Sequence, residues 1–361
     1  MSSGRPCRRA GSPRDRCRRV AAVAALLLAL PIVPASAAVA AMARTGAPVM
    51  GTILQVTVIA DDDAAARRLA DASIAEARRW DDILTTWRSD GELARLNARA
   101  GTGLVPVSAD LFAALQQMQK LSVATGGAFD PVAGALSLHW RDESVPKPAP
   151  QPTLHRIAAA LTLRDGKAAL AKGTALDAGG IGKGIALDRI AGLLRAGGAQ
   201  AAFADFGGSS QIAVGAPPGS AQGWNVLVTG LRTGQVAGLL LLRDRALSTS
   251  RAIGTGAAGP IIDPESAMPV APPRLATVQA SDAATAEAWS KAAVIRGRAG
   301  LQAARAARIE VRFEDGDGYF ATPAFEALAP PSPQNSVETA PNVLEHEIQL
   351  PHSAGTGRGK R

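Results

Sequence analysis

The spacing of apolar residues along the chain predicts both helices and strands. In residues 51–59, GTILQVTVI, apolar and polar side chains partly alternate, as they do in a half-buried strand. In residues 108–124, Leu111, Leu115 and Met118 recur at helical spacing and predict a buried stripe on one helix face. The same two patterns predict further helices at 64–85, 181–195 and 283–295, and further strands at 201–206, 211–214, 224–228, 236–242 and 309–313.

The order of these elements predicts an α+β fold. Helices and strands are mixed without the regular alternation of a doubly wound sheet, so we expect mixed or antiparallel sheets flanked by helices. The folded domain is predicted to cover residues 46–328, with a proline-rich surface loop at 142–153. Residues 329–361 turn to Pro, Ser, Asn and Gly and predict a disordered tail, in which residues 343–350, VLEHEIQL, are compatible with a lone strand.

The first 37 residues have the three parts of a secretory signal peptide. Seven arginines precede a short apolar run, VAAVAALLLALPIVP, which ends at the small residues Ala35-Ser36-Ala37. The run is short for a membrane span, so we expect residues 1–37 to be cleaved and the mature protein to be soluble and periplasmic or otherwise extracytoplasmic. An uncleaved segment would instead anchor the protein at the inner membrane. The arginine pairs do not distinguish the Sec route from the twin-arginine route.

Removal of this segment changes the charge of the chain. The full sequence carries 39 basic and 31 acidic residues, and cleavage removes seven arginines and one aspartate, which leaves 32 against 30 and a net charge of about +2. A nearly neutral mature protein gives no support to a nucleic-acid partner. Both cysteines, Cys7 and Cys17, also lie in the removed part, so the mature chain has no thiol for a disulfide or a metal site.

The stretch LDAGGIGKG, residues 176–184, is the first candidate for chemistry. Its glycines allow close approach to the backbone, the start of a helix favours an anion, and Lys183 adds a positive charge. It is not a Walker loop, because Asp177 and Gly184 stand where that pattern needs glycine and a hydroxyl. It is not the dinucleotide fingerprint G-x-G-x-x-G either, because Gly180, Gly182 and Gly184 give G-x-G-x-G. The alternative is a glycine turn that only packs a strand against a helix.

Other short segments accompany this turn in a fixed order along the chain: MGT at 50–52, TTWRSDGELARLN at 85–97, TGGAFDP at 125–131, DFGG at 205–208, STS at 248–250, IIDPESAMPV at 261–270 and AEAWSKAAVIRG at 286–297. The series resembles the FAD:protein FMN transferase family, the ApbE-type flavin transferases, from about Met50 to Phe320. The resemblance implies an ApbE-like fold in one two-lobed domain. It also implies an exported, Mg²⁺-dependent transferase that moves FMN from FAD to a threonine hydroxyl of an acceptor flavoprotein and releases AMP.

The resemblance also implies a set of site residues. Lys183 would contact a phosphate, and the other expected FAD contacts are Met50, Trp87, Ala128, Phe129, Asp130, Asp177, Ile261 and Ser290. Each has a simpler alternative: Trp87 and Phe129 could be core aromatics, and Met50 could merely start a strand. Asp188, one turn into the helix, is expected to be a solvated or helix-stabilising acid rather than a ligand.

The chain departs from the family pattern at the reacting end. The family's metal positions correspond to the Gly180 carbonyl, Glu287 and Lys291, but an ammonium group has no lone pair for a metal. Gly259-Pro260 stand where a histidine is usual, so no catalytic residue is assigned; the histidines that remain are His139, His155, His346 and His352. Glu287 and Lys291, four residues apart on a helix, could form an ordinary surface pair worth about 0.3–0.5 kcal/mol.

A sharper hypothesis is that the Lys291 ammonium replaces the cation and contacts a phosphate directly, with little or no need for magnesium and with slow or absent transfer. Three functions therefore stay open: an active FMN transferase, a flavin-binding protein or carrier without transferase activity, and an FAD pyrophosphatase that uses water as the nucleophile.

Overall fold

The computed structural model describes Met1 and residues 40–133, 136, 156–232, 235–252, 261–323 and 325. The described residues from Ala40 onward form one compact unit. The predicted signal peptide, the proline-rich loop, the C-terminal tail with its candidate strand, the four histidines and Gly259-Pro260 lie outside the described residues. Within the described residues, no helix combines the length and apolar character needed to cross a membrane.

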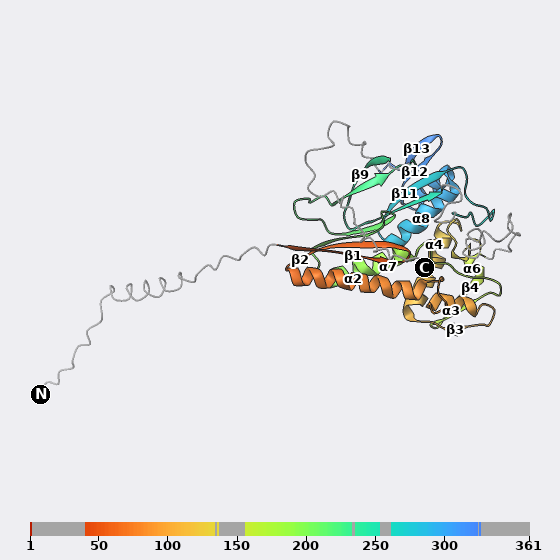
Figure 1. Ribbon diagram of the computed structural model, residues 1–361, viewed down its shortest axis with the longest axis horizontal. Helices are drawn as coiled ribbons and strands as arrows, with labels where there is room; N and C mark the ends of the chain where they lie inside the picture. Colours follow the sequence, from red (N-terminus) through yellow and green to blue (C-terminus); the bar gives the residue numbers. More distant parts are fainter. Residues whose placement is uncertain are drawn as a thin grey trace, which may run out of the picture. The chain divides into compact units, whose positions relative to one another are not determined.

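The centre of the unit is an antiparallel sheet of eight strands (Figure 1). Its spatial order is β1-β2-β6-β7-β10-β11-β12-β13, and every neighbouring pair is antiparallel. The strands are β1 (Ala41–Val49), β2 (Thr52–Ala60), β6 (Ala201–Phe206), β7 (Ser210–Val214), β10 (Ala246–Ala252), β11 (Arg274–Ala280), β12 (Glu310–Asp315) and β13 (Gly318–Ala321).

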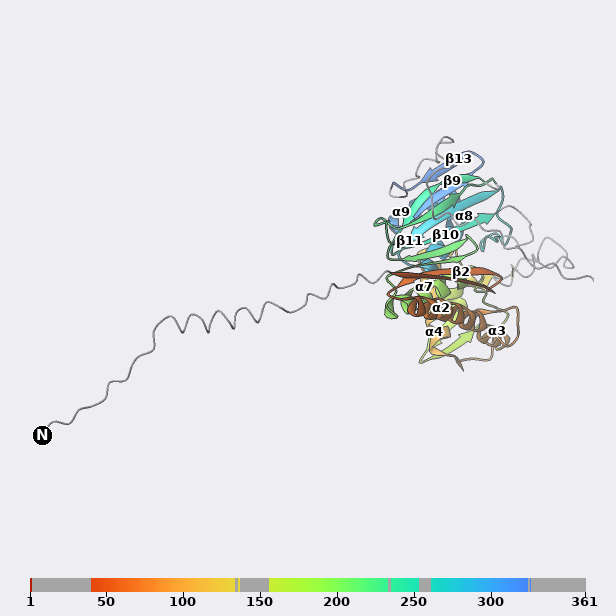
Figure 2. The ribbon, with the colours of Figure 1, turned by 60° about the vertical axis from the view of Figure 1, so that its left-hand side comes forward.

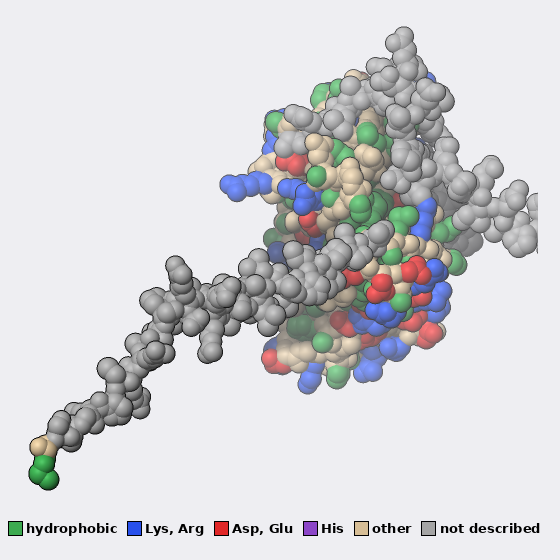
Figure 3. Space-filling view, turned by 90° about the vertical axis from the view of Figure 1, so that its left-hand side faces the viewer, with side chains coloured by type: hydrophobic (Ala, Val, Ile, Leu, Met, Phe, Trp, Pro, Cys, Tyr) green, Lys and Arg blue, Asp and Glu red, His purple; other side chains and the backbone are tan. Residues whose placement is uncertain are grey.

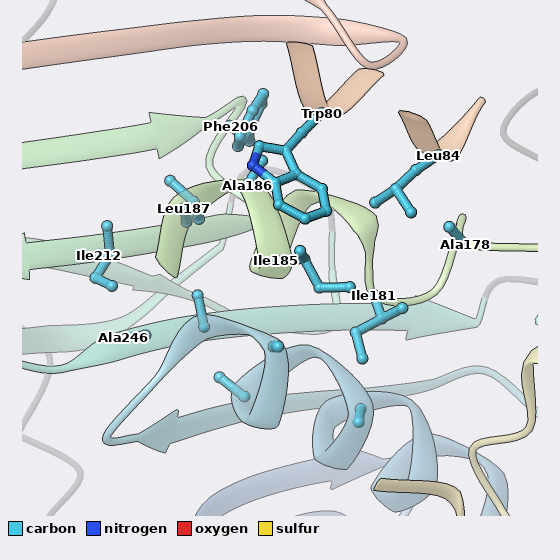
Figure 4. Packing of buried hydrophobic residues seen from close by; sticks show 14 of the residues in the cluster. Trp80, Leu84, Ala178, Ile181, Ile185, Ala186, Leu187, Phe206, Ile212 and Ala246 are labelled. Carbon is cyan, nitrogen blue, oxygen red and sulfur yellow. The ribbon is translucent and has the colours of Figure 1, made fainter. Parts of the chain in front are cut away.

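Three helices cover one face of this sheet. These are α2 (Asp63–Leu84) against β1 and β2, α7 (Gly182–Ala196) against β6 and β7, and α8 (Ala283–Arg296) against β10 and β11. Helix α7 lies between the other two, and α9 (Arg298–Ala306) follows α8 (Figure 2). Trp80, fully buried, points from α2 toward Ile185 and Ala186 of α7 (Figure 4). Full burial of a large apolar side chain contributes about 1.5–3 kcal/mol, so this contact holds α7 against α2.

Two smaller sheets complete the unit. The hairpin of β8 (Trp224–Thr229) and β9 (Val236–Leu242) packs its apolar side chains against Ala213 and Leu247 in a second core. The other is a three-stranded sheet, β3-β5-β4, accompanied by short helices. The strands of this sheet are β3 (Val105–Pro106), β4 (Leu161–Arg164) and β5 (Lys167–Leu170). The helical segments in the same part of the chain are α3 (Glu92–Ala98), α4 (Ala109–Ala124), the 3-10 turn η1 (Pro131–Ala133) and α6 (Ile157–Ala160).

The α+β class and the antiparallel sheets are confirmed, as are the elements predicted from periodicity. The boundaries agree to within one or two residues, because caps were visible in the sequence: Ser108 caps α4 and Gly197 ends α7. The prediction that residues 309–313 form the last strand was wrong, since β13 follows it. Strands β1, β10 and β11 were missed because they lack a clear period-two pattern; β1 contains both Gly46 and Pro48.

Basic and acidic side chains lie interspersed on the described part of the face shown in Figure 3. They do not gather there into a patch of one sign, so this face offers no argument for binding a nucleic-acid backbone.

Candidate functional site

The glycine turn between β5 and α7 is held at its start by a side chain from α3. The Asn97 amide donates to the Leu176 carbonyl at 2.8 Å, and its oxygen accepts from the Leu176 amide at 2.9 Å. One Asp177 carboxylate oxygen accepts the Gly179 amide at 2.9 Å, which closes a local turn. The chain then enters α7 at Gly182. The turn is thus fixed before the helix begins.

The segment around Phe129 meets this turn. The Asp177 amide donates to the Pro131 carbonyl at 2.9 Å. A Cβ on Gly180 would lie 3.2 Å from the Phe129 ring and 3.2 Å from Cδ of Lys291. Gly180 is therefore enclosed between an aromatic ring and the stem of a lysine, so the glycine turn, the Phe129 segment and α8 lie together here.

The β1–β2 turn and the end of α2 approach the same place. Met50 has a positive φ of 52° in that turn, so it does not simply start a strand. A Cβ on Gly182 would lie 3.4 Å from the Met50 methyl group and 3.6 Å from Leu84 of α2. Trp87 follows three residues after Leu84 and is 76% exposed, so it is not a core aromatic. The indole is therefore accessible to solvent at this end of α2, and an indole is a side chain on which a planar ring can stack.

Two arginines hold the glycine pair that precedes Phe129. Arg156 donates to the Gly127 carbonyl at 2.6 Å, and Arg296 of α8 donates to the Gly126 carbonyl at 2.7 Å. Both glycines have positive φ, 60° and 76°, which other residues adopt at a cost. Sequence reasoning missed both arginines because nothing in their local sequence indicates a partner so distant along the chain.

Asp130 lies buried behind this loop and bonds to the backbone. Its carboxylate accepts the amides of Val132 and Ile157, each at 3.1 Å, and lies 3.4 Å from the Ser122 hydroxyl. Burial raises the pKa of its carboxyl, while these donors and Arg156 oppose the rise. Asp130 therefore shapes the loop that carries Phe129, which is compatible with an indirect role in holding a ligand.

Glu287 lies at the centre of the site and is fully buried. One oxygen accepts the Gly184 amide at 3.0 Å, and the other accepts the Ser210 hydroxyl at 2.5 Å and lies 3.6 Å from the Lys183 ammonium. Burial opposes its ionisation, but Lys183, Lys291 and the two hydrogen-bond donors outweigh it and hold the pKa of Glu287 below its usual value. The carboxylate is thus charged and ties α8 to the start of α7.

Lys291 lies half-buried one turn after Glu287. Its ammonium contacts the Glu287 carbonyl at 3.5 Å, and it forms no ion pair as close as that of Lys183. Burial lowers the pKa of Lys291 to about 8; the Glu287 charge opposes the fall, and the Lys183 charge adds to it. The interpretation of Glu287 and Lys291 as a surface pair was wrong, because the buried carboxylate pairs with Lys183 instead.

The remaining predicted residues surround this centre. Ser290, fully buried on α8, bonds to the hydroxyls of Ser248 at 3.1 Å and Ser250 at 2.7 Å, so it fastens α8 to β10. Ile261 is half-buried against the main core, and Ala128 is buried next to Phe129.

The donor set does not fit a divalent metal ion at the Gly180, Glu287 and Lys291 positions. Both Glu287 oxygens are engaged by protein donors, and Lys291 brings a positive charge to Gly180. A divalent ion about 4 Å from that ammonium would be repelled by roughly 8 kcal/mol at an effective dielectric near 20. Within the described ranges, no group of three or more His, Cys, Asp and Glu side chains could hold a metal ion.

Asp188 bonds to the N-terminus of α8. Its two oxygens accept the amides of Ala283 at 2.6 Å and Ala284 at 3.1 Å. It therefore stabilises a helix, though not the one that carries it, and it is only partly exposed. Burial raises the pKa of Asp188 to about 7 against the effect of these amides, and the charges of Asp282 and Glu287 add to the rise.

This shift predicts a pH dependence of stability. Because the pKa of Asp188 in the folded protein, about 7, exceeds the unfolded value of about 3.9, the folded state holds the extra proton between them. The contribution of protonated Asp188 to the free energy of unfolding is therefore full below about pH 4. It falls as the pH rises toward 7, by up to about 1.4 kcal/mol per pH unit. Urea denaturation at several pH values should show this slope in the wild type and in D71N, an exposed aspartate, but not in D188N. An equal slope in D188N would contradict the assignment.

The fold matches solved structures. It is similar to the structure of the flavin transferase ApbE from Vibrio cholerae, with a TM-score of 0.67 and 21% sequence identity. The superposition covers 80% of this chain and 99% of the Vibrio cholerae chain. A model of the ApbE family matches residues 43–313, and the chain belongs to that family.

Two curated relatives are both named FAD:protein FMN transferase. The chain is 31% identical to that of Treponema pallidum over 233 residues, 56% of this chain and 63% of the relative, so the match spans less than two thirds of the relative's length. It is 26% identical to that of Klebsiella pneumoniae over 289 residues, 74% of this chain and 81% of the relative.

Proposed function

We propose that the protein is an FAD:protein FMN transferase that acts on an extracytoplasmic flavoprotein. The observation that carries the proposal is the convergence of Phe129, the glycine turn and two lysines at the start of α7. Positive charge at the start of a helix favours the diphosphate of a dinucleotide. The exposed Trp87 and the Met50 turn supply surfaces for flat rings close by. The exported location is supported by the signal-like sequence of residues 1–37.

The chemistry is a phosphoryl-type transfer. A threonine hydroxyl of the acceptor gives its proton to solvent water, and its oxygen forms a bond to the FMN phosphorus. The bond from that phosphorus to the bridging oxygen breaks, and AMP leaves with the electron pair. Negative charge grows on the leaving phosphate, so a fixed cation beside it lowers the barrier. Lys183 fits this role, because Glu287 holds its ammonium at the start of α7. The described residues contain no histidine, so the proposal assigns no histidine base.

The decisive test is mass spectrometry of an exported flavoprotein acceptor incubated with this protein and FAD. Transfer predicts a mass increase equal to the FMN moiety on one threonine, and the equivalent threonine-to-alanine acceptor should stay unmodified. Absence of labelled acceptor under all conditions would refute transferase activity.

A flavin carrier is the second candidate function. It is favoured by Glu287, whose oxygens are bound by protein donors, and by Lys291, whose ammonium cannot bind a metal ion. A carrier predicts a yellow protein with no labelled acceptor. Release of free FMN and AMP without an acceptor would instead identify a pyrophosphatase. One chromatographic run of the same reaction separates the labelled acceptor, unreacted FAD, and free FMN with AMP.

A further inference from the structure

We propose that the Lys291 ammonium takes the place of a divalent cation in this site, so that the diphosphate of FAD binds without a metal ion. The inference rests on the proposed function, in that FAD is the ligand, and it specifies how the site recognises that ligand.

The hydrogen bonding of Lys291 is the first argument. An ammonium has three donors, and within the described residues the Glu287 carbonyl at 3.5 Å is its single hydrogen-bond acceptor. The side chain is half-buried, and a charge withdrawn from water with so few partners is costly. An anionic oxygen from a bound ligand would satisfy the remaining donors. The stem is packed against Gly180, so the head group is held near the turn rather than free to swing away.

The charge balance of the cluster is the second argument. Lys183 and Lys291 flank one carboxylate, that of Glu287, which leaves one net positive charge at the N-terminus of the 15-residue helix α7. A diphosphate diester carries two negative charges, and the helix N-terminus contributes a further partial positive charge. Cluster and helix end together therefore offset about one and a half of the two ligand charges without a metal ion.

The engagement of Glu287 is the third argument. Its oxygens bind the Gly184 amide, the Ser210 hydroxyl and the Lys183 ammonium, so its role is to position Lys183 and α7. A metal ion could bind Glu287 only by displacing these donors. The site is therefore built around two ammonium groups rather than around a ligand set for a cation.

The test is a titration of FAD into the full protein, followed by flavin fluorescence, in buffers with Mg²⁺ or with EDTA. We expect the two dissociation constants to agree within about threefold for the wild type. K291M should weaken FAD binding in EDTA by about tenfold to a hundredfold, the range of a charge-assisted hydrogen bond. K291T, which also removes the ammonium, should lose as much in either buffer, because both Glu287 oxygens stay engaged by protein donors. K167M, an exposed lysine on β5, is the control.

A tenfold or greater loss of wild-type affinity in EDTA would overturn the inference while leaving the proposed function intact, and so would wild-type binding by a folded K291M. Failure of the wild type to bind FAD in either buffer would refute the proposed function itself. The wild-type comparison needs no variant, so it holds even where a substitution disturbs folding.

Discussion

Replacement of Gly184 with alanine is expected to destabilise the protein by about 2–4 kcal/mol. A Cβ at this position would lie 2.6 Å from the Ala283 carbonyl oxygen and 2.7 Å from Cα of Ala284. Both are backbone atoms of the start of α8, so neither can rotate away. The two helices would have to separate, which would also stretch the bond from the Gly184 amide to Glu287. Urea denaturation followed by circular dichroism measures the change.

The matched control is Gly192→Ala on the same helix. A Cβ there meets nothing within 4 Å, and the position is exposed. Alanine is a better helix former than glycine, so this variant should be more stable by about 0.5–1 kcal/mol. Equal stabilities for the two variants would show that close helix packing at Gly184 is not the reason for its glycine. A loss of stability in Gly184→Ala but not in Gly192→Ala would assign Gly184 to helix packing rather than to ligand binding.

Replacement of Lys183 with methionine is expected to slow FMN transfer by about 100-fold or more, since removal of one fixed group that stabilises transition-state charge typically costs this much. The methionine keeps most of the stem and removes the charge. Buried Glu287 would lose its close ion pair, although the Ser210 and Gly184 donors would remain. Single-turnover transfer to the acceptor at saturating FAD measures the effect on the chemical step, and a parallel fluorescence titration measures the effect on binding.

K172M, at an exposed position before the glycine turn, is the control and should transfer at the wild-type rate. If K183M transfers FMN at a rate close to that of K172M, Lys183 has no role in stabilising the leaving phosphate. K183R tests whether a positive charge at this position is sufficient for transfer, because arginine keeps the charge but places it in a different geometry.

Much of the fold could be predicted from local sequence. The helices α2, α4 and α7 carry apolar stripes, and capping residues such as Ser108 and Gly197 mark where helices begin or end. The strands of the central sheet were harder: β1 and β11 are defined by their partners, and their own sequences do not alternate clearly. Strand formation depends on pairing and burial that the chain acquires only when folded.

The candidate site was predicted in part. The glycine turn with Lys183 could be singled out from its residue types, whereas Phe129 and Met50 were singled out by the resemblance to the ApbE-type flavin transferases. The roles of Asn97, Ser210, Arg156 and Arg296 could not, although Asn97 ends one of the motifs in the series and Ser210 follows another. Each acts through a partner far along the chain.

The sequence by itself determined where the four longest described helices lie, that a lysine stands in a glycine turn at the start of one of them, and that an ammonium occupies position 291. Only the tertiary structure decided that Glu287 is buried and committed to Gly184, 103 residues away, and to Ser210, 77 residues away, rather than paired with Lys291 on the helix surface. The physical reason is the distance along the chain over which a sequence pattern is informative. Periodicity depends on residues within one or two helical turns, whereas the charge state and partners of a buried group depend on the elements that the fold packs against it.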